Sequence, residues 1–112
     1  MAYHHLGVLM EKLGSFSTGS ELFHVYKSHY QANGATAITL MCDNGEPYGH
    51  LSVNVDGVSD ALPKGSFVVS HNVNDWENSA EMQKQLLHGF FEDIGETVSY
   101  GYVTGQPVWR IP

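Results

Sequence analysis

The side chains in this sequence that could carry out acid–base or nucleophilic chemistry are its histidines, carboxylates and one cysteine. The chain has seven His, one Cys and twelve Asp plus Glu. Cys42 lies inside an apolar run, where a free Cys usually packs as a small buried side chain rather than acting as a nucleophile. The sequence contains no Gly-x-Ser-x-Gly elbow and no phosphate-binding glycine loop. An enzyme using His and carboxylate acid–base chemistry is therefore our third hypothesis, and no catalytic residue is assigned.

Metal-ligand spacing is also missing from the sequence. There is no Cys-x-x-Cys, no His-x-x-x-His and no His-Glu-x-x-His. His4 and His5 are adjacent, so they face different ways on a helix or a strand. A hairpin would allow Cys42 or Asp43 to approach His50, but surface histidines explain the pattern more simply. We predict no metal and no cofactor.

Acidic residues are concentrated in the last third of the chain, where a helix is expected. Six carboxylates and one Lys lie between Asp75 and Glu96. If the helix and the loop after it share a face, that face is negative and would attract a basic partner. The alternative is a solvated helix face whose acids match the helix dipole. The candidate docking residues are Asp75, Trp76, Glu77, Glu81, Glu92, Asp93 and Glu96.

Aromatic and polar side chains allow a second kind of site. Tyr48, His50 and Asn54 fall close together in one extended run and could line a pocket for a small, nucleotide-like ligand. Such a pocket would lie between sheet and helix or between subunits. Among the other large aromatics, we expect Trp109 and one of Tyr100 and Tyr102 to belong to the core.

The net charge restricts the classes of partner. Five Lys plus Arg against twelve Asp plus Glu give a formal charge of −7, which repels nucleic-acid phosphates and anionic membranes. Direct nucleic-acid binding is therefore disfavoured, and a basic protein surface, including one that normally holds nucleic acid, is favoured. One Cys excludes an intrachain disulfide and fits the cytoplasm. No stretch is long and apolar enough to span a membrane, and the N-terminus does not resemble a signal peptide.

The first half of the chain predicts a meander. Leu6, Leu9, Met10 and Leu13 have helical spacing, so we expect a helix over 5–13, with a strand as the alternative, and then a loop over 15–20. Asn-Gly pairs favour tight hairpin turns at 33–34 and 43–45. The three predicted strands cover 21–32, 35–43 and 48–56, with Leu51, Val53 and Val55 inward and His50, Ser52, Asn54 and Asp56 outward.

The second half predicts one helix between strands. We expect it over about 75–88, with Asn74 as its N-cap, Glu77 reaching back to it and Gly89 as a left-handed C-cap. Strands are expected at 66–70, 97–103 and 108–111. The predicted fold is a single α+β domain over 1–112: an antiparallel sheet of five or six strands with the helix on one face. Residues 1–20 would form an N-terminal helix and loop extension to a core at 21–112.

Several segments resemble an uncharacterised family of small accessory proteins from conjugative elements, plasmids and phage-related islands. The resemblance covers about residues 22–112 and rests on the segments Tyr30-Gln-Ala-Asn-Gly34, Asn44-Gly-Glu-Pro-Tyr48, Leu51-Ser-Val-Asn-Val55, Gly89-Phe-Phe-Glu-Asp93 and Pro107-Val-Trp-Arg110. It implies the context of a mobile element and brings no catalytic residues. By analogy with other accessory proteins of such elements, it suggests an inhibitor of a host defence or regulatory protein.

The expected function is therefore that of a non-enzymatic protein-binding accessory protein that docks through its acidic helix face. The alternative is a binder or sponge for a small molecule. Self-association into a homodimer is also allowed, because a sheet with few charges at its edges can pair with a second copy.

Overall fold

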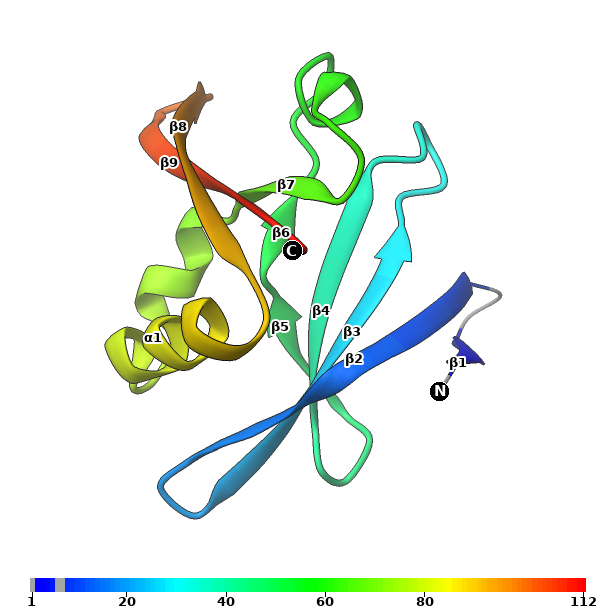
Figure 1. Cartoon of the computed structure of the whole chain (residues 1–112), viewed down its shortest axis with the longest axis vertical. Helices are drawn as coiled ribbons and strands as arrows, with labels where there is room; N and C mark the ends of the chain where they lie inside the picture. Colours follow the sequence, from blue (N-terminus) through cyan, green and yellow to red (C-terminus); the bar gives the residue numbers. More distant parts are fainter. Residues whose placement is uncertain (1, 6–7) are drawn as a thin grey trace.

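The computed structural model of the protein describes residues 2–5 and 8–112, in which nine strands form two antiparallel sheets (Figure 1). The first sheet has the order β1-β2-β3-β4-β5 and comprises β1 (Ala2–His5), β2 (Val8–Thr18), β3 (Glu21–His29), β4 (Thr36–Cys42) and β5 (Pro47–His50). The second has the order β6-β7-β9-β8 and comprises β6 (Ser52–Val53), β7 (Ser66–Val69), β8 (Glu92–Tyr100) and β9 (Val103–Arg110). The predicted antiparallel α+β class is confirmed, but two sheets replace the single one.

The one α-helix of the described residues, α1 (Ser79–Gly89), follows two short 3₁₀ helices, η1 (Ser59–Ala61) and η2 (His71–Asp75). It lies to one side of both sheets and contacts β2 and β8 (Figure 1). Met82 and Leu86 are its buried residues, and both belong to the core. The predicted main helix is therefore present, displaced by a few residues toward the C-terminus.

A single hydrophobic cluster joins both sheets and the helix. Burying these apolar side chains is the main favourable term in folding. Trp109 is 1% exposed, as predicted for a core residue. Tyr100 is half-buried and Tyr102 is fully exposed, and neither belongs to the core cluster, so the prediction that one of them would is wrong. The cluster's members include Phe16, Phe23, Ile38, Leu40, Leu51, Phe67, Phe91 and Trp109.

The chain is extended over Val8–Thr18, so the helix expected over 5–13 is wrong there and its strand alternative is correct, while the loop expected over 15–20 is reduced to a turn at 19–20. β2 pairs with β3 from Glu11↔Lys27 to Thr18↔Glu21, with a bulge between Lys12 and Gly14. Apolar residues three and four apart fit a helix, but Phe16 gains core contacts only as part of a strand that pairs with β3. Of the residues behind the helix prediction, Leu6 lies outside the described ones. Residues 8–18 are thus part of the first sheet, not an extension.

The strand predicted over 48–56 is divided between the two sheets. β5 pairs with β4, while β6 pairs with β7, and the chain changes sheet at the fully buried Leu51. Ser52, predicted to face outward, is 2% exposed. Its hydroxyl accepts a hydrogen bond from the Ile38 amide at 2.9 Å and contacts the Tyr30 hydroxyl at 2.8 Å. The alternation is broken because a strand that crosses between sheets cannot keep one solvent face.

The predicted N-cap at Asn74 is also wrong. Asn74 lies in η2, and the N-cap of α1 is Asn78, which is left-handed (φ 58°) and makes no side-chain capping bond. Asn tolerates this conformation better than most residues. Asp75 and Glu77 therefore precede the helix, and Glu81 is the acid in its first turn. At the other end Gly89 is helical and Phe90 is the C-cap with φ −129°, so the left-handed glycine cap is not formed.

Candidate functional site

Trp76 and Tyr48, which belong to the two different predicted sites, are in contact. Trp76 stands between η2 and α1, and Tyr48 is in β5. Their rings meet edge-to-face with centroids 5.3 Å apart, and Tyr48 meets Phe23 in the same way at 4.8 Å. Both are half-buried at the rim of the core. This places an amphipathic aromatic pair at the surface, next to the acidic segment.

A glycine makes this contact possible. A Cβ built on Gly49 would lie 2.9 Å from Cζ2 of Trp76, closer than carbon atoms can pack, so the indole lies directly on the backbone of β5. Gly14 of β2 receives Phe90 in the same way, with Cε1 at 2.7 Å from a built Cβ. Trp76 precedes α1 and Phe90 follows it, so both ends of the helix are fixed to the first sheet by a ring on a glycine.

Two carboxylates lie close enough to Tyr48 to act on its hydroxyl. Burial, followed by the negative charge of Glu21, raises the pKa of Tyr48. The charge of Glu77 adds to the rise, and a hydrogen bond with the Glu77 backbone opposes it. Glu21 was not among the predicted docking residues, because it lies 56 positions before Glu77 in the sequence and only the fold brings it near. We define the acidic–aromatic surface as Glu21, Tyr48, Trp76 and Glu77.

The remaining docking candidates fall into two groups. In the first group, Asp75 is exposed next to Trp76 in the sequence, and Glu81 is exposed in the first turn of α1. Glu92, Asp93 and Glu96 lie instead on β8, an edge strand of the second sheet. The sequence suggested one face for all seven residues, whereas the structure places four of them in η2, α1 and the segment between, and three on β8.

The β8 carboxylates already have local roles. Arg110 donates from Nε and Nη2 to one Glu92 oxygen at 3.0 and 2.9 Å. Asp93 accepts a hydrogen bond from the Gly95 amide at 2.9 Å. Charges on an edge strand discourage pairing with another chain. Preventing β8 from pairing with another chain is enough to explain these carboxylates, so they do not require a binding partner.

The predicted pocket residues do not converge. Tyr48 packs on Phe23 and Trp76, whereas His50 is exposed and its Nδ1 lies 3.3 Å from the Thr39 hydroxyl. Asn54 pairs with Asn33 through two amide hydrogen bonds of 3.0 and 3.4 Å. These three residues therefore occupy separate surroundings rather than one ligand pocket.

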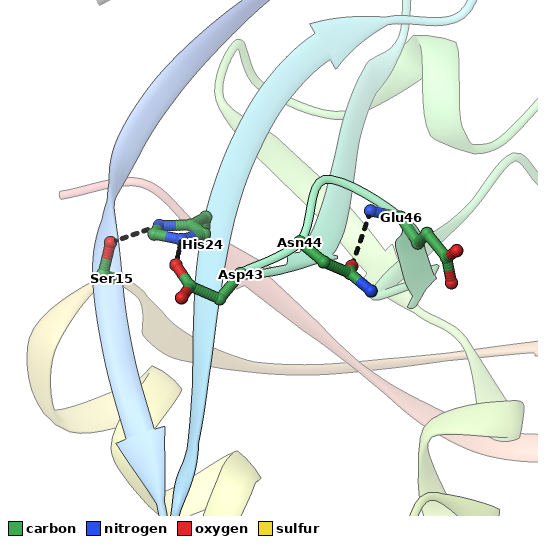
Figure 2. Close-up of polar contacts among 5 residues, drawn as sticks. All are labelled: Ser15, His24, Asp43, Asn44 and Glu46. Atoms are coloured by element: carbon green, nitrogen blue, oxygen red, sulfur yellow. Dashed lines mark hydrogen bonds and ion pairs between the residues drawn. The ribbon is translucent and has the colours of Figure 1, made fainter.

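A Ser–His–Asp chain lies across β2, β3 and the turn after β4, and the sequence analysis missed it. The Ser15 hydroxyl lies 2.7 Å from Nδ1 of His24, and Nε2 of His24 lies 3.0 Å from Oδ1 of Asp43 (Figure 2). A carboxylate only accepts hydrogen bonds, so Nε2 carries the proton and Nδ1 accepts from Ser15. In this arrangement His24 could take the hydroxyl proton and activate Ser15 as a nucleophile.

The surroundings of this chain weaken the activation. The Asp43 side chain is 70% exposed, and Ser15 is exposed on the strand. Solvent screens the attraction between an exposed carboxylate and an imidazolium. The turn itself is well formed: Asn44 Oδ1 accepts from the Glu46 amide at 3.0 Å (Figure 2). The turn holds Asp43 in place, but both ends of the Ser15–His24–Asp43 chain are exposed to water, while the His24 side chain between them is 17% exposed.

Other chemistry-bearing groups are scattered. Cys42 is a free, partly buried thiol at the edge of the core. No group of three or more His, Cys, Asp and Glu side chains within the described part of the chain is arranged to hold a metal ion. Across the same residues, no helix has the length and apolar content needed to cross a membrane.

Comparisons with known proteins found no match. No protein-family model, no curated protein and no solved structure is similar to this chain at a significant level. The resemblance to accessory proteins of mobile elements therefore stays a prediction. The function has to be argued from the residues themselves.

Proposed function

We propose that this chain is a non-enzymatic binding protein that docks on a basic surface of another protein through the acidic–aromatic surface. The observation that carries the proposal is the edge-to-face pair of Tyr48 and Trp76 beside the carboxylates of Glu21 and Glu77. Aromatic faces attract Lys and Arg through cation–π interactions, and carboxylates form charge-assisted hydrogen bonds with the same groups. The two features together favour a cationic side chain over an apolar one.

The composition supports the same direction. The formal charge of −7 steers basic partners toward the protein, and exposed Asp75 and Glu81 extend the negative field around Trp76. Charge alone does not explain tight binding, and the structure adds Tyr48 and Trp76 to it, because Tyr and Trp are among the side chains that most often contribute large binding energies in interfaces. Glu92, Asp93 and Glu96 take no part in this reduced surface.

The partner class follows from charge complementarity. Protein surfaces that normally hold nucleic acid are rich in Lys and Arg, so they match this surface. In the mobile-element context that the sequence resemblance implies, the partner would be a host defence or regulatory protein that this chain inhibits in the cytoplasm. A homodimer is not required, and the carboxylates on β8 oppose pairing through that edge.

The test is a pair of charge reversals. The Glu21→Lys, Glu77→Lys double variant reverses both carboxylates beside Tyr48, whereas Glu96→Lys reverses one carboxylate on β8. We expect the double variant to lose at least tenfold in affinity for the captured partner and Glu96→Lys to retain it. Equal binding by all three proteins would refute docking through this surface. Equal loss in both variants would mean that net charge, not this surface, controls binding.

The Ser15–His24–Asp43 chain favours a second candidate function, hydrolysis of a small activated ester. Ser15 Oγ would attack the carbonyl carbon while His24 Nδ1 takes its proton, and the alcohol would leave with that proton. Water would then release the acid from Ser15. An ester assay with wild type and Ser15→Ala tests it: this candidate requires hydrolysis that Ser15→Ala abolishes, and equal rates in both proteins would eliminate it.

A further inference from the structure

A cleft of about 300 Å³ opens between the loop 30–35 and the loop that carries η1. Both loops lie at the top of the molecule in Figure 1. The first residues of β4 and β7, Thr36 and Ser66, line the cleft, and His29 at the end of β3 lines it from the first sheet. Its volume is at the lower end of the range for small-molecule sites. The cleft shares no residue with the acidic–aromatic surface.

The walls of the cleft are fixed by their own hydrogen bonds. Asn33 bonds to Asn54 and also accepts from the Ala35 amide at 3.0 Å. Ser59 accepts from the Val55 amide at 2.8 Å and donates to the Val53 carbonyl at 3.2 Å. The polar groups of both walls are thus occupied within the protein. The cleft is preorganised, which lowers the entropy cost of binding a ligand.

Two hydroxyls that line the cleft are not used in this way. Thr36 is 7% exposed and Ser66 is 4% exposed. Neither hydroxyl has a hydrogen-bond partner among the residues that the structure describes, whereas the buried Ser52, Ser59 and Ser70 side chains all do. Neither oxygen is a buried unpaired atom, so both stay accessible from the cleft, where a ligand or water can bond to them.

The charges at the cleft define the ligand. Lys64 provides an ammonium group, His29 provides imidazole nitrogen atoms, and Asp60 provides a carboxylate from η1. Hydroxyl and ammonium donors bind phosphate oxygens, and a carboxylate accepts from a sugar hydroxyl. We propose that the cleft binds a ribose phosphate group, with the phosphate between Lys64, His29, Thr36 and Ser66 and a ribose hydroxyl at Asp60. Free pentose phosphates and nucleoside monophosphates both carry this group.

The test is a titration of the full chain with ribose 5-phosphate, adenosine monophosphate, ribose and inorganic phosphate, followed by amide NMR shifts. We expect saturable shifts at Gly34, Ala35 and Lys64 with ribose 5-phosphate, which binds at least tenfold more tightly than ribose or phosphate alone. If adenosine monophosphate binds as tightly as ribose 5-phosphate, the cleft accepts nucleoside monophosphates. If adenosine monophosphate does not bind, the ligand is a free pentose phosphate. No saturable shift with either phosphorylated compound would overturn the proposal, as would binding no tighter than that of inorganic phosphate.

Two substitutions test whether the cleft is a specific binding site. They distinguish it from a cleft whose Thr36 hydroxyl is only structural, and from one that attracts any anion. Thr36→Val keeps the shape of the side chain and removes the donor, and Lys64→Ala removes the cation. Each substitution should lower the affinity for ribose 5-phosphate by at least about tenfold. The matched control, Lys84→Ala on α1, should leave that affinity unchanged. Thr36→Val should melt at the wild-type temperature or above, because its hydroxyl has no partner to lose. Unchanged binding in both variants would show an adventitious ion only and contradict the proposal.

Discussion

Trp76 reaches from the segment before α1 to the first sheet, where its ring meets that of Tyr48 edge-on at a centroid distance of 5.3 Å. The contact fixes the start of the helix and also exposes part of two aromatic rings beside carboxylates. One pair of residues therefore has a structural and a functional role, and the two roles can be separated by substitutions.

The Gly49→Ala substitution should destabilise the protein. Its new methyl group would lie 2.9 Å from the indole of Trp76, and overpacking of this kind costs about 1–3 kcal/mol of the free energy of unfolding. In a Trp76→Ala background the same substitution should cost little, because the obstructing ring is absent. Urea denaturation of the four proteins measures the coupling.

Gly89→Ala is the matched control for Gly49→Ala. Gly89 is the last residue of α1, and a Cβ there would meet no atom within 4 Å. Alanine is the better helix former, so stability should be unchanged or rise by up to about 1 kcal/mol. Additive costs for Gly49→Ala and Trp76→Ala, or a loss in Gly89→Ala as large as in Gly49→Ala, would contradict the contact.

Ser52→Ala should cost about 1–3 kcal/mol of unfolding free energy. The Ile38 amide donates to the Ser52 hydroxyl and would be left unsatisfied in a buried position. The exposed Ser20→Ala is the control and should stay within about 0.5 kcal/mol of wild type. Thermal unfolding of both variants measures the difference, and similar melting temperatures would show that Ser52 is not a structural hydroxyl.

The stability of the protein should fall above pH 10, partly because of Tyr30. Burial raises the pKa of Tyr30 above its model-compound value of 10.0, and the Ser52 hydrogen bond only partly opposes this. The folded state therefore holds the phenol proton more tightly than the unfolded state. The stabilisation is complete below pH 10 and is lost as the pH rises through the folded pKa.

Tyr30→Phe isolates this effect. The variant should be less stable at neutral pH by about 1 kcal/mol, because it loses the hydrogen bond to Ser52, yet its stability should fall less steeply above pH 10. Urea midpoints between pH 7 and pH 11 provide the comparison. Parallel pH profiles for the two proteins would show that Tyr30 is not responsible.

Asp43→Asn should have only a small effect on folding. The carboxylate is 70% exposed, and exposed ion pairs contribute about 0–1 kcal/mol. Thermal unfolding at pH 6 and pH 8 measures it. A loss of more than about 2 kcal/mol of unfolding free energy would contradict this and would mean that the Ser15–His24–Asp43 hydrogen bonds are needed to stabilise the first sheet.

Local signals in the sequence predicted the regular parts of the fold. The Asn-Gly pair at 33–34 lies in the connection between β3 and β4, but the predicted tight turn is replaced by a longer loop over 30–35, and of the pair only Gly34 has a positive φ, of 76°. Phe23 and Val25 lie two residues apart in the strand predicted over 21–32, so they share one face of β3, and both are buried. The helix lies where its apolar residues predicted it, but it begins at Ser79 rather than near 75, so Asp75 and Glu77 precede it.

Long-range pairing decided the parts that were predicted wrongly. Val8–Thr18 is a strand because β3 pairs with it, which spacing alone could not show. A hairpin turn at Gly19-Ser20 places Ser15 opposite His24, so recognising that turn would have revealed the hydrogen-bonded pair. The approach of Glu21 to Tyr48 depends on two separate hairpins and left no local signal.

The most direct test of the docking proposal is quantitative capture of partners from a lysate of the cells that carry the gene. Tagged wild type, the Glu21→Lys, Glu77→Lys double variant and Glu96→Lys would be purified gently and weighed by native mass spectrometry. We predict one stoichiometric basic protein on wild type and on Glu96→Lys, and its loss from the double variant. The same protein retained on the double variant, or no protein on wild type, would contradict the proposal.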